Sequence, residues 1–133
     1  MHRFRDTHTF SITHTTKDRL PRLPFFEIKN MVLGKKYELS FVCTGNSLSR
    51  KLNMQYRRKD KPANVLSFPL GGHRGELFID LTEAKKEGRV YRESLKKRVG
   101  ILFIHGILHL KGFTHGSTMN VEEVKIRKKF HVA

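Results

Sequence analysis

The chain has 133 residues and a mass of 15.6 kDa, which is the usual size of one compact domain. Its ten phenylalanines exclude a disordered chain, and no apolar run approaches the roughly 18 residues needed to cross a bilayer. The first twenty residues contain no apolar signal segment, and the single cysteine, Cys43, excludes an internal disulfide. We therefore expect a cytoplasmic protein with no membrane contact and no disulfide partner.

The charge is strongly positive, because 27 lysines and arginines face only 12 acidic residues, for a net charge of +15. Such an excess predicts attraction to a polyanion, of which nucleic acid is the commonest. A basic surface that serves only solubility is the alternative. Two stretches concentrate the cations, residues 50–61 and residues 85–98.

Apolar residues that alternate, or run together between turn residues, predict four strands. These strands cover residues 7–13, 37–43, 65–68 and 77–79. Helices are expected over residues 23–33, from Asn46 or Ser47 onward, over residues 81–87 and from about residue 92 to Gly112. A last helix is expected to open at a capping box formed by Asn120 and Glu123.

The helix that follows Asn46 carries Leu48, Leu52 and Tyr56 at steps of four, so we expect these three side chains to form its buried stripe. Strands interspersed with helices indicate an α+β fold. We expect a single domain over residues 1–133, in which helices cover a mixed four-stranded sheet.

Three histidines near the C-terminus have the spacing of metal ligands. His105 and His109 are four residues apart in a predicted helix, so both imidazoles leave the same face one turn apart. Gly112 permits a left-handed turn that can bring His115 back as a third ligand. Three nitrogens and one water make a catalytic zinc site with an open position. Nickel or another divalent ion is the alternative.

The same spacing occurs in metzincin proteases, whose motif is H-E-x-x-H-x-x-G-x-x-H. The glutamate that serves those enzymes as general base is Gly106 here. A water activated at this site would lack the carboxylate that takes its proton during peptide hydrolysis. Peptide hydrolysis is therefore only the alternative function.

Two segments resemble the signatures of the YbeY family of metal-dependent endoribonucleases. Residues 105–115, HGILHLKGFTH, are similar to the family motif H-G-x-L-H-L-x-G-Y-D-H, except that Phe113 replaces the tyrosine and Thr114 the aspartate. Residues 52–69, LNMQYRRKDKPANVLSFP, resemble the motif L-N-x-x-Y-R-x-x-D-x-P-T-[DN]-V-L-S-F-P, and GELFI at residues 75–79 resembles the strand that follows it. The resemblance spans about residues 39–115 and implies a zincin-like metal-site helix.

The resemblance implies single-strand-specific RNA cleavage in ribosomal RNA maturation, with ribosomal RNA and the small ribosomal subunit as partners. Metal-activated water would attack the phosphodiester, and Arg57, which matches the motif arginine, would stabilise the charge of the transition state. Phosphate binding without a catalytic effect, or a salt bridge to Asp60, is the alternative role of Arg57. The neighbouring cations would hold phosphates without reading sequence; they are Arg50, Lys51, Arg58, Lys59 and Lys61. A non-catalytic ribosome-assembly factor with a structural metal also stays open.

Overall fold

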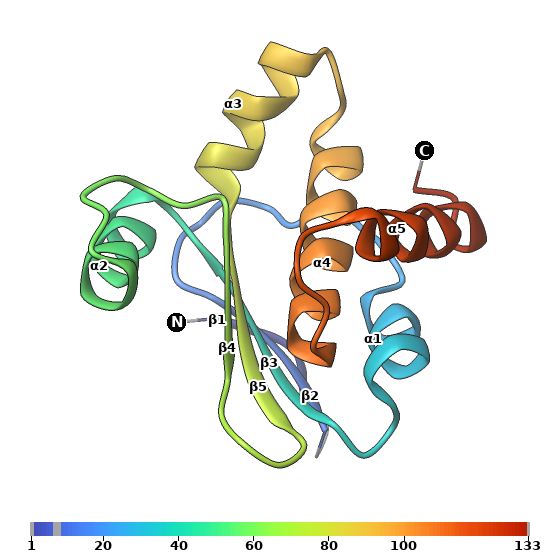
Figure 1. Ribbon diagram of the computed structural model, residues 1–133. Coiled ribbons are helices and arrows are strands. Elements are labelled where there is room, and N and C mark those ends of the chain that lie inside the picture. Colours follow the sequence, from blue (N-terminus) through green and yellow to red (C-terminus); the bar gives the residue numbers. More distant parts are fainter. Residues whose placement is uncertain (1, 7–8, 133) are drawn as a thin grey trace.

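Five strands form one mixed sheet in the part of the chain that the computed structural model describes, residues 2–6 and 9–132 (Figure 1). The strands are β1 (His2–Asp6), β2 (Phe10–His14), β3 (Glu38–Thr44), β4 (Val65–Pro69) and β5 (Arg74–Asp80). Their order across the sheet is β1-β2-β3-β5-β4. The three inner strands run parallel, and β1 and β4 pair antiparallel with their neighbours.

Helices cover both faces of the sheet, which confirms the α+β class. They are α1 (Phe25–Leu33), α2 (Asn46–Arg57), α3 (Leu81–Tyr91), α4 (Leu95–Lys111) and α5 (Ser117–Lys129). Helix α2 lies on one side of the sheet, and α1 and α4 lie on the other, with α5 packed across α4 (Figure 1). No helix in the described residues combines the length and hydrophobicity that a bilayer crossing requires.

Helix α4 is the centre of the core. Nine of its 17 residues are buried, because it packs on β4 and β5 and also contacts α1, α3 and α5. The ring of Phe103 lies 4.8 Å from that of Phe25 and 5.0 Å from that of Phe41, which joins α4, α1 and β3. Such aromatic contacts give a close-packed interior in which a side chain on α4 has little freedom to move.

The side chains of edge strand β4 alternate between the two faces of the sheet. Ser67 points to the α4 side, where its Oγ donates a 2.9 Å hydrogen bond to the carbonyl oxygen of Gly106. Phe68 points to the α2 side, where its ring lies 4.9 Å from the ring of Tyr56. The two helices therefore meet adjacent residues of the same strand from opposite sides.

Polar contacts attach the first half of α2 to the sheet. The Oγ of Ser49 donates to Oδ2 of Asp80 at 2.6 Å, and Nδ2 of Asn46 donates to the same oxygen at 2.7 Å. This orientation buries Ser49 and Asn53, so the expected stripe is wrong. Its two leucines are only half-buried, and Tyr56 is 59% exposed.

Three other expectations need correction. The sheet has five strands rather than four, because the charged sequence of β1 lacks the alternation of apolar residues that predicts a strand. Residues 7 and 8, the first two of the strand expected over residues 7–13, lie outside the described part of the chain. Helix α3 continues through Gly88, where a Cβ would lie only 2.7 Å from the backbone oxygen of Glu93, so this glycine allows a close approach rather than a helix end. Helix α5 begins at Ser117, before the expected capping box, and Gly116 is the residue that precedes its first turn.

Candidate metal centre

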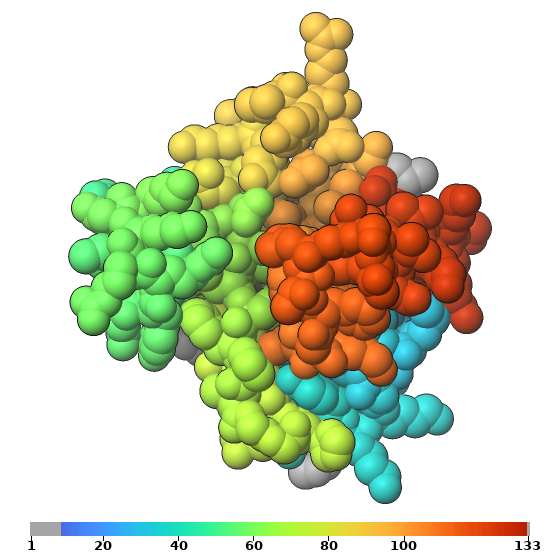
Figure 2. Space-filling view, in the orientation of Figure 1, coloured from blue at the N-terminus to red at the C-terminus, as the bar shows by residue number. Residues whose placement is uncertain are grey.

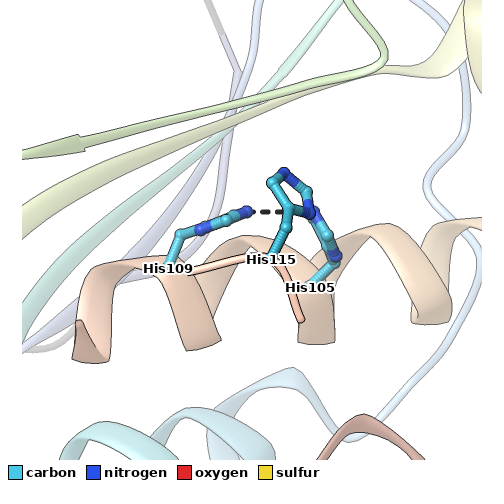
Figure 3. Close-up of side chains that lie close together, drawn as sticks. All are labelled: His105, His109 and His115. Carbon is cyan, nitrogen blue, oxygen red and sulfur yellow. Dashed lines mark hydrogen bonds between the residues drawn. The ribbon is translucent and has the colours of Figure 1, made fainter. Parts of the chain in front are cut away.

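Helix α4 presents His105 and His109 on one face, as their spacing predicts. The two Nε2 atoms face each other at 3.0 Å, and the rings stand nearly perpendicular, with an interplanar angle of 84° (Figure 3). Both residues are half-buried. The pair therefore opens toward solvent although α4 itself is central to the core.

His115 joins this pair from the segment that follows the helix. Gly112 ends α4 in the left-handed conformation, with φ of 113°, and its backbone N–H donates to the carbonyl of His109. The chain then turns back, so that the His115 ring lies 5.2 Å from the ring of His105 and 4.8 Å from that of His109. One nitrogen of each of the three histidines lies within 4.8 Å of the others.

The second nitrogen of each α4 histidine has its own partner. Nδ1 of His105 lies 2.6 Å from Oε1 of Glu123 in α5, and Nδ1 of His109 lies 3.0 Å from the backbone oxygen of Phe113. Each partner is an acceptor, so each Nδ1 carries the proton and donates it. Both Nε2 lone pairs are then free to face a shared ion, which is the arrangement that orients metal-bound histidines.

The electrostatic environment favours the neutral form of one of these ligands. Burial is the largest cause that lowers the pKa of His109 below its ordinary value, and the neighbouring His105 and His115 lower it further, whereas the Phe113 carbonyl and, more weakly, Glu123 raise it. Neutral imidazole is the form that binds a metal ion.

The donor set fits a divalent ion of the zinc type. With Zn–N distances of about 2.0–2.1 Å, tetrahedral ligand atoms stand about 3.3 Å apart, close to the observed 3.0 Å between the Nε2 atoms of His105 and His109. The described residues supply three ligands and no fourth, and His115 is exposed. A position is thus left for water or substrate, as catalytic zinc sites require.

Gly106 lies against the sheet rather than beside the histidines. A Cβ at this position would collide with Cδ1 of Leu77 and would lie 3.1 Å from Cγ2 of Val65 and 3.2 Å from Oγ of Ser67. The metzincin glutamate therefore has no counterpart here, and side chains of β4 and β5 occupy the space that it would need. The close approach of residue 106 to the side chains of Leu77, Val65 and Ser67 explains why a glycine follows His105.

The remaining cations of the predicted site lie outside the histidine group. Arg57 is the exposed last residue of α2, on the other side of the sheet from α4. Asp60 pairs with Arg50 at 2.7 Å instead of with Arg57. Within the described residues, Arg57 has no ion-pair partner, and the same is true of the other exposed cations around the end of α2, which are Lys51, Arg58, Lys59 and Lys61.

The second basic stretch differs, because acidic side chains neutralise much of it. Arg98 binds Glu87 at 2.9 Å and Glu93 at 3.2 Å. Three lysines of this stretch also have acidic partners; the pairs are Lys85–Asp18, Lys86–Glu83 and Lys97–Glu93. The end of α2 is thus the stronger candidate surface for a polyanion.

Sequence reasoning missed Glu123 as a partner of His105. Its spacing from Asn120 predicts a capping box, but its carboxylate accepts a hydrogen bond from the imidazole 18 positions earlier in the chain. The lysine- and arginine-rich surroundings of Glu123 give no local signal of this contact.

Comparison with known proteins identifies relatives over nearly the whole chain. The family model described as Endoribonuclease YbeY matches residues 5–132. The chain is 35% identical over 113 residues to an Endoribonuclease YbeY of Nautilia profundicola, covering 80% of each protein. It is 37% identical over 119 residues to that of Aquifex aeolicus, covering 84% of this chain and 77% of the relative. A Thermotoga maritima protein of known solution structure shares the fold, with a TM-score of 0.65 at 21% identity over 92% of each chain.

Proposed function

The chain belongs to the YbeY family of endoribonucleases, and from this premise we propose that it is a zinc-dependent enzyme that cleaves single-stranded RNA during ribosomal RNA maturation. Ribosomal RNA and the small ribosomal subunit are its proposed partners, and the cytoplasm its proposed location. The observation that carries the proposal is the group of His105, His109 and His115, whose ring nitrogens converge on one open position.

The proposed ligands of the ion are the Nε2 atoms of His105 and His109 together with His115. When bound, the ion would lower the pKa of a coordinated water toward about 7 and polarise a phosphoryl oxygen. Glu123 and the Phe113 carbonyl hold the first two rings in the ligating orientation. The half-buried setting excludes part of the bulk water, which strengthens the interaction of the site with a charged phosphate.

Arg57 is the proposed catalytic cation. Its guanidinium is exposed and unpaired within the described residues, so it is free to donate two parallel hydrogen bonds to a phosphate. It would act by stabilising negative charge that develops in the transition state. The proposed phosphate-holding residues are Arg50, Lys51, Arg58, Lys59 and Lys61; Arg50 would exchange its exposed pair with Asp60 for a phosphate at small cost.

RNA hydrolysis agrees better with the site than peptide hydrolysis does. Position 106 cannot accommodate a glutamate, and the exposed cations favour a polyanionic substrate. A structural ion would have four protein ligands, whereas the described residues provide three. The packing at position 106, the exposed cations and the three-ligand set together favour a catalytic site for RNA.

The test combines metal analysis with cleavage of a structured and a single-stranded RNA. We expect about one zinc per chain, and we expect alanine at His105, His109 or His115 to remove both the metal and the cleavage. A casein assay run in parallel should show no hydrolysis. Metal-dependent thermal stabilisation without RNA cleavage would instead indicate an assembly factor, and near-stoichiometric metal in all three variants would refute the ligand assignment.

A further inference from the structure

Tyr56 is an aromatic side chain held in place yet open to solvent. Its ring lies 4.9 Å from that of Phe68 at an interplanar angle of 52°, and Phe68 in turn meets Phe78 edge-on at 5.7 Å. Phe68 and Phe78 are half-buried, whereas Tyr56 is 59% exposed. The two phenylalanines thus support the tyrosine from beneath and leave the rest of its surface free.

The surroundings of this ring are cationic and suited to an anionic chain. Arg57, Arg58 and Lys59 follow Tyr56 directly, and all three are exposed and without an ion-pair partner in the described part of the chain. Asn53 holds this segment in place: its carbonyl accepts from the backbone of Lys59 at 3.3 Å, and its Nδ2 donates to the Lys61 carbonyl at 2.9 Å. An ordered row of cations beside a free ring is the arrangement that binds single-stranded nucleic acid.

The other tyrosines of the chain lack this arrangement. Tyr37 is buried, at 7% exposure. Tyr91 is 63% exposed, but the guanidinium of Arg98 lies over its ring at 5.2 Å, and that guanidinium is already neutralised by two glutamates. Tyr91 therefore provides a matched control, because it is similarly exposed but Arg98 covers one face of its ring.

The ring also lies near the metal centre around the edge of the sheet. Ser67 contacts the helix of the histidines and Phe68 contacts Tyr56, so adjacent residues of edge strand β4 separate the two sites. Figure 2 shows the end of α2 and the turn after α4 on the same face of the molecule, on either side of the segment that includes β4. A chain that crosses this edge would contact both.

We propose that Tyr56, supported by Phe68, is a stacking site for an unpaired nucleobase of the RNA strand whose phosphates lie on the neighbouring cations. The inference rests on the proposed function and extends it to the selection of single strands. In a duplex both faces of a base are covered by its neighbours, whereas an unpaired base can stack on a protein ring. Arg57–Lys59 would bind the phosphates of either form, so the ring provides the discrimination.

The test measures binding of a ten-residue oligoadenylate to the metal-loaded protein within the first seconds after mixing, and gel electrophoresis verifies that the oligonucleotide is still intact. Tyr56→Leu keeps an apolar contact with Phe68 but removes the aromatic face. We expect this variant to bind about 5- to 150-fold more weakly, the range that corresponds to the loss of one base–aromatic stack. Tyr56→Phe should bind like the wild type, and so should the control, Tyr91→Leu. Unchanged melting temperatures would establish that each variant is folded.

Two further measurements separate stacking from charge. The salt dependence of binding should be unchanged in Tyr56→Leu, whereas Lys59→Ala should reduce its slope by about 0.7. An oligonucleotide of equal length and charge but without bases should bind the wild type and Tyr56→Leu equally. Duplex RNA should likewise show no effect of Tyr56→Leu.

Equal affinity of the wild type and Tyr56→Leu for oligoadenylate would overturn the stacking site, as would an equal loss in Tyr91→Leu. If the wild type still cleaved RNA, the proposed function would survive that result. Conversely, base-dependent binding through Tyr56 without cleavage of any RNA would refute the proposed function and leave the stacking site standing. No binding of any oligonucleotide by the wild type would refute both.

Discussion

Gly106 allows a test of how tightly α4 packs against the sheet beside the histidine group. Gly106→Ala places a Cβ against Cδ1 of Leu77 and within 3.2 Å of two β4 side chains. Relief of glycine entropy in a helix favours alanine by about 1 kcal/mol, but forced overpacking of a core costs about 1–3 kcal/mol. We therefore expect a net loss of up to about 2 kcal/mol in the free energy of unfolding, measured by urea denaturation.

A double-mutant cycle isolates the contact. Leu77→Val removes the colliding atom together with one buried methylene, at a cost of at least about 0.8 kcal/mol. In that background Gly106→Ala should cost less than it does alone, with a coupling of at least about 0.5 kcal/mol. Strictly additive costs, or a Gly106→Ala protein more stable than the wild type, would show that the close approach of α4 to β5 is not what requires the glycine.

Gly106→Glu completes the metzincin motif in sequence but not in structure. A carboxylate at this position would be buried against Leu77 and Val65 without a partner, at a cost of several kcal/mol. That cost is comparable with the total stability of a small domain, about 5–15 kcal/mol. We expect an unfolded or aggregated protein; a folded Gly106→Glu variant that binds metal and hydrolyses casein would refute the reasoning.

Three further predictions concern binding and catalysis. Glu123→Gln should weaken zinc affinity about 10- to 100-fold, measured by competition with a chelator, because the carboxylate orients His105; unchanged affinity would assign Glu123 to packing alone. Arg57→Ala should lower the cleavage rate at saturating RNA about 10²- to 10³-fold with little change in RNA affinity. Arg57→Lys should restore the rate only partly. The control, Arg58→Ala, should weaken RNA binding modestly and leave the saturated rate unchanged. RNA affinity should fall by orders of magnitude between 50 and 300 mM salt, because about five unpaired cations surround the end of α2; equal affinities would refute a phosphate-binding role for them.

The histidine group was predictable from sequence because it is local. His105 and His109 are fixed relative to each other by the helical repeat, and Gly112 places the turn that returns His115. The partner of His105 was not predictable in this way. Asn120 and Glu123 have the spacing of a capping box, and only the crossing of α5 over α4 shows that the carboxylate serves the imidazole instead.

The prediction for Tyr56 failed for a related reason. Helical periodicity shows which residues share a face, but it does not show which of two neighbouring faces meets the sheet. In α2 that choice depends on Asp80, which is distant in sequence and draws Ser49 and Asn46 toward itself. Tyr56 consequently lies at the margin of the contact, where an exposed ring is available for a ligand.

The relation between the two sites depends on the register of β4. Ser67 pairs with Leu77 of β5, and Phe68 pairs with Glu76, so the pleat directs Ser67 to α4 and Phe68 to α2. A slip of one residue would exchange these directions, placing a hydroxyl beneath Tyr56 and an aromatic ring against the backbone of Gly106. The Oγ of Ser67 lies only 2.9 Å from the carbonyl oxygen of Gly106, so β4 lies too close to α4 at this point to accommodate an aromatic ring. The close contact between Ser67 and α4 therefore favours the observed register, in which Ser67 meets the helix of the histidines and Phe68 supports Tyr56.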